Sequence, residues 1–327
     1  MNCKVILVRA TGGPEVMKYE THDVAAPGEG QVLVRHRAIG LNFVDIYFRS
    51  GVYPAPSMPF VPGNEAAGVI EAVGPGVTEF KQGERVAYAG GPLGSYAQMR
   101  TMPARFLVKI PDAIDDATAA AAMLKGMTAQ FLIHSTYQVK RGDTILVHAA
   151  AGGVGLILCQ WAAHLGAIVI GTVGSDEKAA LAARNGCTHT INYSREDFVA
   201  RVKEITAGAG VPVVYDSVGQ TTFMKSLDCL RPRGLMASYG QASGLVPPFS
   251  INLLAAKGSL YLTRPTLNTY AARREDLVAI AGALFEVLSS GIVRCEIKQR
   301  FPLEDAAAAH RALADRHTTG STVLMPN

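Results

Sequence analysis

A chain of 327 residues is longer than a single domain usually is, so we expect two domains, each with its own hydrophobic core. The 31 basic and 27 acidic residues give a net charge of only +4 without a block of Lys or Arg, which argues against a protein dedicated to nucleic acids or membrane surfaces. The five cysteines lie far apart and no apolar run approaches the roughly 18 residues of a membrane span, which favours a cytoplasmic protein without a disulfide framework or zinc knuckle.

The first part of the chain, to about residue 121, is predicted to be mainly β structure. Its short apolar runs are separated by Gly and Pro, as in an all-β unit with little helix. The expected strands are residues 4–9, 31–39, 66–73, 84–88 and 95–100. Over residues 115–137 the apolar period becomes helical, and this change of pattern indicates the crossing into another domain.

Strands alternate with helices over the middle of the chain. The expected strands are residues 144–147, 167–172, 188–191, 211–216 and 234–239. Helices are expected from the glycines near 155 to 165 and at 176–185, 196–206 and 221–230. This order gives right-handed crossovers and predicts a parallel, doubly wound sheet.

The stretch TILVHAAAGGVG, residues 144–155, organises this middle region. It reads as a strand, a tight turn and the start of a helix, and the turn contains Ala151, Gly152, Gly153, Val154 and Gly155. Unpaired N–H groups and the positive end of the helix dipole suit a pyrophosphate there. The spacing departs from G-x-G-x-x-G because alanines occupy the first positions, so taken alone it fits a purely structural turn equally well.

The last part of the chain is predicted to return to the first domain. Its expected elements are a strand at 258–263, a helix at 273–290, a strand at 296–301, a helix at 303–315 and a strand at 321–325. The pieces after 265 have no sheet partners in the alternating region, so we expect domains at 1–123, 124–265 and 266–327, the last being part of the first. The strand at 258–263 would be a sheet edge, which predicts pairing across a two-fold axis in a homodimer.

Several motifs together resemble one known family from end to end. They are GGPEV at 12–16, GLNFVD at 40–45 with Tyr47, RSG at 49–51, Tyr53-Pro54, LKGMT at 124–128, the run 148–155, VYDSVG at 214–219 and LTRP at 262–265. On these motifs the chain resembles the zinc-free quinone oxidoreductases of the medium-chain dehydrogenase/reductase superfamily, the group related to zeta-crystallin. The resemblance implies an α/β protein, with a Rossmann doubly wound parallel sheet domain and a split GroES-like, mainly β catalytic domain. It also implies NADPH as cofactor and a small quinone or activated carbonyl reduced in the interdomain cleft.

Two positions that hold zinc ligands in the zinc-dependent relatives are Asn42 and Asn64 here. An amide is a poor zinc ligand beside thiolate and imidazole. We therefore expect no metal, which argues against a simple alcohol dehydrogenase because that reaction would need a Lewis acid.

The resemblance also implies the catalytic residues, which are Asn42, Asp45, Tyr47, Tyr53 and Arg264. Asp45 could instead only cap the following helix, Asn42 could only satisfy the turn, and Arg264 could pair with a neighbouring carboxylate. A quinone is a strong electrophile, so hydride transfer needs alignment, and Tyr or solvent can protonate the developing oxyanion.

The implied cofactor-binding residues come from both expected domains. They are Asn42, Lys125, Thr128, Ala151, Gly152, Gly153, Val154, Gly155, Gly174, Ser175, Lys178, Tyr193, Ser217, Val218, Tyr239 and Gly240. Lys125 could instead be a solvated charge on a helix surface.

The cofactor is expected to be NADPH rather than NADH. The strand that ends near Gly174-Ser175 carries no acid that would accept hydrogen bonds from the ribose hydroxyls and repel a phosphate. Asp176 and Glu177 argue the other way, and we interpret them as complementing the helix dipole.

The remaining candidates are given structural interpretations. His36, His134, His164 and His310 lack partners at a recognisable spacing, and Cys159 and Trp161 fit packing positions on a helix. The leading function is therefore NADPH-dependent quinone reduction, with an enal or enone reductase as a close alternative. A non-enzymatic NADPH-binding crystallin or RNA-associated protein is the alternative from another class.

Overall fold

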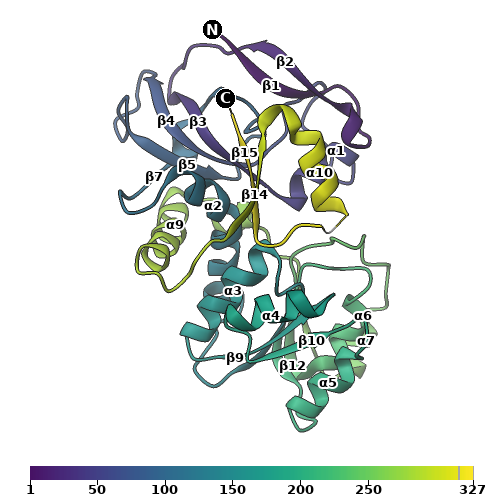
Figure 1. The fold of residues 1–327 in the computed structure, drawn as a ribbon. Coiled ribbons are helices and arrows are strands. Elements are labelled where there is room, and N and C mark those ends of the chain that lie inside the picture. The colour runs from purple at the N-terminus through teal and green to yellow at the C-terminus, as the bar shows by residue number, and fades with distance from the viewer. Residues whose placement is uncertain (316, 327) are drawn as a thin grey trace. The chain divides into compact units, whose positions relative to one another are not determined.

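The structure is a computed structural model that describes residues 1–315 and 317–326. The chain forms two compact units (Figure 1). Unit 1 consists of Met1–Met127, Ala271–Ser289 and Cys295–Asn327, and unit 2 of Thr128–Tyr270 and Ser290–Arg294. Within the described ranges, no helix combines the length and apolar character that a membrane crossing requires.

Unit 1 is built mainly of β-strands. Its strands are β1 (Asn2–Val8), β2 (Met17–Asp23), β3 (Gln31–Leu41), β4 (Glu65–Val73), β5 (Arg85–Ala89), β6 (Met99–Pro103), β7 (Val108–Lys109), β14 (Ile297–Pro302) and β15 (Ser321–Met325). The main sheet has the order β14-β15-β3-β4-β5-β7, with β6 also paired to β3. The strand β15, near the C-terminus, pairs with β3 in the first part of the chain. The sheet therefore joins the early and the late parts of the chain, as the purple and yellow ribbons of Figure 1 show.

Helices cover this sheet and complete the core of unit 1. They are α1 (Phe43–Ser50), the first part of α2 (Asp116–Phe131), α9 (Arg274–Ser289) and α10 (Ala306–Ala314). The core contains the fully buried Tyr88 and Tyr96 together with Ile39 and Met102, and Ala309 of α10 packs into the same cluster. The C-terminal helix therefore belongs to the same core as the N-terminal strands.

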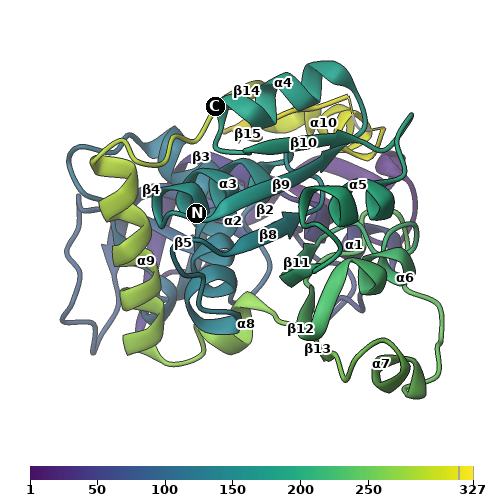
Figure 2. The ribbon, with the colours of Figure 1, turned by 90° about the horizontal axis from the view of Figure 1, so that it is seen from below.

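Unit 2 contains the parallel sheet that the alternating pattern predicts. Its strands are β8 (Thr144–Val147), β9 (Ile168–Val173), β10 (His189–Asn192), β11 (Val211–Asp216), β12 (Leu230–Ser238) and β13 (Tyr261–Thr263). They follow one another in the order β10-β9-β8-β11-β12-β13, as Figure 2 shows. The expected doubly wound parallel sheet is confirmed, because every neighbouring pair is parallel.

The helices of unit 2 connect these strands. They are α3 (Gly153–His164), α4 (Asp176–Arg184), α5 (Phe198–Ile205), α6 (Phe223–Ser226), α7 (Asn252–Ala256) and α8 (Leu267–Tyr270), and α2 ends in a π-helical segment at Leu132–Thr136. The winding runs from β8 outward to β10 and then from β11 outward to β13. The carboxyl ends of the neighbours β8 and β11 therefore form the topological switch point, where open α/β sheets bind ligands.

Several local predictions were wrong, and three of them have a plain structural reason. The strand β2 was not expected because MKYETHD has no apolar run, and pairing with β1 holds it in place. The strand expected at 95–100 is shifted to Met99–Pro103, because the Tyr96 N–H donates to Pro62 and the Tyr96 carbonyl accepts from Ile6. The helix expected at 221–230 is shorter, because β12 already begins at Leu230 beside Val211.

Candidate functional site

The glycine turn of unit 2 has the geometry of an anion-binding turn. Gly152 is the N-cap of α3, and the first intrahelical bond is donated by Leu156 to the Gly152 carbonyl at 2.9 Å. The N–H groups of residues 153–155 therefore precede the helical ladder and can bind an anion. Ala149, at the position where the motif departs from glycine, has a left-handed φ of 52°.

Gly152 and Gly155 have different surroundings. A Cβ atom on Gly155 would lie 2.3 Å from the Ala149 carbonyl oxygen, so α3 can approach the turn only because this residue is glycine. A Cβ atom on Gly152 would have the same oxygen as its nearest neighbour at 3.1 Å. A Cβ atom at residue 152 would thus make a tight contact, whereas at residue 155 it would clash, so the packing requires glycine more strictly at 155.

The carboxyl ends of β11 and β12 carry four further predicted residues, which are Ser217, Val218, Tyr239 and Gly240. The buried Asp216 carboxylate holds this region, because it accepts from the Val218 N–H at 2.7 Å and from the Thr222 hydroxyl at 2.7 Å. A Cβ atom on Gly240 would lie 2.6 Å from the Ser217 carbonyl oxygen, so the two loops are in close contact. Burial raises the pKa of the Tyr239 hydroxyl.

The end of β9 brings together Gly174, Ser175, Lys178 and Tyr193. A Cβ atom on Gly174 would lie 2.8 Å from the Tyr193 hydroxyl, and the Ser175 hydroxyl accepts from the Lys178 N–H at 3.3 Å as the N-cap of α4. These residues form one surface next to the carboxyl edge of the sheet.

Asp176 does more than complement the helix dipole, so that interpretation was incomplete. Its carboxylate accepts from the Asn192 amide at 2.9 Å and forms an ion pair with Arg195 at 2.9 Å. Of the two acids that argued against NADPH, Asp176 is thus occupied by a cation and an amide.

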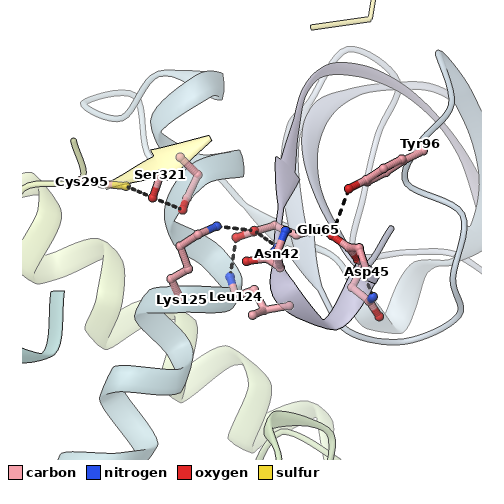
Figure 3. Close-up of polar contacts among 10 residues, drawn as sticks. Asn42, Asp45, Glu65, Tyr96, Leu124, Lys125, Cys295 and Ser321 are labelled. Carbon is pink, nitrogen blue, oxygen red and sulfur yellow. Dashed lines mark hydrogen bonds and ion pairs between the residues drawn. The ribbon is translucent and has the colours of Figure 1, made fainter. Parts of the chain in front are cut away.

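In unit 1 the start of α1 is held by a buried carboxylate (Figure 3). Asp45 is fully buried and accepts from the Asn42 N–H at 2.9 Å, the Asn64 amide at 2.9 Å and the Tyr96 hydroxyl at 3.2 Å. The capping interpretation of Asp45 is therefore confirmed. Burial raises the pKa of Asp45 to about 6, although these donors act in the opposite direction.

His310 is a core histidine, one of the two structural interpretations given to it, and its partners come from distant parts of the chain. Arg49 donates to His310 Nδ1 at 3.3 Å, so Nε2 carries the proton and lies 2.9 Å from the Tyr96 oxygen. The Tyr96 hydroxyl in turn donates to Asp45. Burial lowers the pKa of His310 to about 3, in keeping with a neutral ring.

Glu65, which the sequence analysis missed, connects two predicted residues. It is fully buried and accepts from the Asn42 side-chain amide at 2.7 Å and from the Lys125 ammonium at 3.2 Å. The Lys125 side chain is only 6% exposed, so its interpretation as a solvated charge is wrong. An acid at the start of the apolar run AAGVI was the signal available in the sequence.

The other predicted residues are distributed over both units. Tyr47 and Tyr53 in unit 1 meet edge to face with ring centroids 5.2 Å apart. Thr128 is buried on α2, and Arg264 is exposed directly after β13, both in unit 2. Cys159 and Trp161 are buried in α3, which confirms that they are packing residues.

The two positions expected to lack metal ligands, Asn42 and Asn64, each donate an amide hydrogen to a carboxylate, Glu65 and Asp45 respectively. Among residues 1–315 and 317–326 no group of three or more His, Cys, Asp or Glu side chains is arranged to hold a metal ion.

The parallel sheet has this strand order and a glycine turn at its switch point, and the same chain folds a mainly β unit around buried polar groups. This combination is typical of the class of two-domain dehydrogenases and reductases. Family models agree: the alcohol dehydrogenase GroES-like domain matches residues 28–112 and the zinc-binding dehydrogenase domain matches residues 153–278.

Known proteins resemble this chain over its whole length. It is 55% identical over 323 residues to a quinone oxidoreductase of Pseudomonas aeruginosa, with 99% of each chain covered. It is 50% identical over 327 residues to a 2-haloacrylate reductase of a Burkholderia species, with 98% of each covered. The crystal structure of Escherichia coli quinone oxidoreductase complexed with NADPH matches with a TM-score of 0.97 at 47% identity, covering 99% of this chain and 100% of that one. The chain belongs to the zinc-independent quinone oxidoreductases of the medium-chain dehydrogenase/reductase superfamily.

Proposed function

We propose that this protein is an enzyme that reduces small quinones with NADPH. The observation that carries the proposal is the end of β9 at Gly174 and Ser175, which itself carries no acid and lies beside Lys178 and Tyr193, in a chain whose relatives are named quinone oxidoreductases. It is the surface that a nucleotide with a 2′-phosphate needs.

The residues of unit 2 fit NADPH. The N–H groups that follow Gly152 would bind the pyrophosphate, and Ser175, Lys178 and Tyr193 would hold the 2′-phosphate. The loops at Ser217, Val218, Tyr239 and Gly240 would line the same sheet edge, with Thr128 contributing a hydroxyl to the nicotinamide amide. When bound, NADPH supplies the hydride.

The residues of unit 1 would align the quinone. We assign Asn42 and Lys125 to the nicotinamide half of the cofactor, and Tyr47 and Tyr53 to the substrate, together with Arg264 of unit 2. A hydride and a proton convert a quinone into a hydroquinone, so the chain needs to supply alignment and access to a proton, from a tyrosine hydroxyl or water. Asp45 acts by holding α1, since its carboxylate already accepts three hydrogen bonds.

The reaction is proposed to proceed without a metal. What supports this is the donor set: the amides of Asn42 and Asn64 already bond to carboxylates, and an amide is a weak zinc ligand.

Reduction of an activated alkene is the second candidate. The 2-haloacrylate reductase, at 50% identity over the whole chain, favours it. The same alignment of a hydride donor with an electrophilic carbon serves an enal, an enone or a haloacrylate.

A spectrophotometric screen tests both candidates. Purified protein is mixed with NADPH and, separately, several quinones, enals, enones and 2-chloroacrylate, and the loss of NADPH absorbance is followed. We expect turnover with at least one quinone. Faster turnover with the alkenes would replace the first candidate by the second, and binding of NADPH without turnover would favour a non-enzymatic role.

We further propose that the protein works as a cytoplasmic homodimer with a small-molecule substrate. The five cysteines are free, which suits a reducing compartment. The strand β13 is at the edge of its sheet with Tyr261 62% exposed, which suits pairing with a second copy.

A further inference from the structure

Two side chains that are far apart in the sequence share one buried acceptor. Asn42 directly precedes α1 and Lys125 lies in α2, and both bond to Oε2 of Glu65, at 2.7 Å and 3.2 Å (Figure 3). The other carboxylate oxygen accepts from the Leu124 N–H at 2.5 Å. Glu65 thus connects α1 to α2 through its side chain alone.

The fold provides the space for this carboxylate. A Cβ atom on Gly40 would lie 2.1 Å from Glu65 Oε2, so β3 approaches closely only because residue 40 is glycine. The Glu65 side chain is fully buried and Lys125 nearly so, and this burial makes a missing partner costly. Each charge therefore depends on the other.

Glu65 also determines how its two partners are presented. An ionised carboxylate can only accept, so the nitrogen of the Asn42 amide faces Glu65 and the orientation of its carbonyl oxygen is set. The Lys125 ammonium is held at the same oxygen and cannot follow its usual range of rotamers. One acid therefore controls the position of both.

We propose that Glu65 is a positioning residue that holds Asn42 and Lys125 for contact with the nicotinamide half of NADPH. This inference rests on the proposed function, since it takes NADPH as the ligand. Glu65 acts through its two partners and does not touch the cofactor.

Calorimetric titration of Glu65→Gln with two ligands tests the inference. NADPH carries the nicotinamide, whereas 2′,5′-ADP carries only the adenosine and its 2′-phosphate. We expect the affinity for NADPH to fall about tenfold and that for 2′,5′-ADP to stay within about twofold, because a lost charge-assisted hydrogen bond affects only the nicotinamide half. A merely structural role would weaken both ligands alike.

Two further variants, which do not contain Glu65→Gln, keep the inference testable if Glu65→Gln does not fold. Glu65→Asp keeps the charge but is one methylene too short to reach all its donors, and it should show the same selective loss in a smaller degree. In Asn42→Ala/Glu65→Asp the loss of affinity for NADPH should be smaller than the sum of the losses in Asn42→Ala and Glu65→Asp, because the two residues act as one unit. Additive losses would overturn the inference.

Asp116→Asn is the matched control. This acid begins α2, the helix that contains Lys125, and it pairs with Arg85 at 2.8 Å and not with Asn42 or Lys125. It should leave the affinity for both ligands unchanged.

The outcomes separate the inference from the proposed function. If wild-type protein binds NADPH and the Glu65 variants lose neither ligand or both equally, the inference fails and the function stands. Wild-type protein that binds 2′,5′-ADP and NADPH equally weakly would overturn both.

Discussion

Gly152 and Gly155 are equivalent in the motif but not in the structure, and this difference separates binding from folding. Gly152→Val should weaken NADPH binding at least about tenfold, because a side chain there would hold the pyrophosphate away from the N–H groups, and it should lower the thermal midpoint less than Gly155→Val because its Cβ contact is less severe. Gly155→Val should instead lower the melting temperature, because its Cβ atom would meet the Ala149 carbonyl oxygen.

The measurements for these two variants are NADPH titration and thermal unfolding. A folded Gly152→Val protein with unchanged affinity for NADPH would remove the turn from the binding site.

Lys178 is the residue proposed to distinguish NADPH from NADH. A charge-assisted contact with phosphate contributes roughly 1.5–3 kcal/mol, so Lys178→Glu should raise the KM for NADPH at least about tenfold. The KM for NADH should change little, because NADH has no 2′-phosphate. The measurement is steady-state kinetics with each cofactor.

Lys203→Glu on α5 is the control for Lys178, since it makes the same charge change at an exposed position. If Lys178→Glu weakened both cofactors alike, or if wild-type protein used both equally, Lys178 would not select the cofactor.

At the scale of the elements, the strand β13 is the basis for predicting a homodimer. It pairs with β12 on one side only, and its outer edge carries unpaired backbone groups that proteins usually cover. Light scattering at micromolar concentration should give twice the mass of one chain. Tyr261→Lys should shift the protein towards the monomer, because it places a cation on a 62% exposed aromatic position of the edge.

Met224→Lys is the matched control for this edge, because Met224 is 39% exposed on α6. A wild-type monomer, or equal effects of the two variants, would contradict the edge-to-edge dimer.

At the scale of the whole molecule, buried histidines predict sensitivity to acid. Burial lowers the pKa of His36 and His310 to about 3 from an ordinary value of 6.5, so the unfolded chain binds protons that the folded chain does not. Each histidine should lower the free energy of unfolding by up to about 1.4 kcal/mol per pH unit as the pH falls from about 6.5 towards 3.

Asp45 acts in the opposite direction. Its pKa is raised to about 6 from an ordinary 3.8, so it stabilises the fold most at low pH and this contribution is lost as the pH rises through 6. In urea unfolding followed by circular dichroism, His310→Gln should make the decline in acid shallower and Asp45→Asn should make it steeper. Parallel curves for the three proteins would contradict this account.

Metal-free catalysis predicts that activity survives exhaustive treatment with EDTA. The amides of Asn42 and Asn64 bond to carboxylates and leave no thiolate or imidazole at these positions. Turnover before and after chelation is compared, and a loss of activity that added zinc restores would show the proposal to be wrong.

Much of unit 2 followed from the sequence alone. The expected bounds of β8 and β11 agree with the structure, as do the glycine turn and the parallel order of the strands. The reason is that buried parallel strands and the helices between them show their periods and turn residues locally. The expected bounds of β15 in unit 1 also agree with the structure, because its apolar run ends at a proline.

Only the tertiary structure decided how the polar residues of unit 1 are joined. Arg49 and His310 are 261 residues apart in the chain, and Glu65 and Lys125 are 60 apart, so no local pattern relates them. Lys125 is buried because the chain brings an acid to the same place, and β2 is a strand because β1 lies beside it. Local sequence determines which element a residue joins, whereas the burial of a charge and its partner depend on segments that meet only when the chain has folded.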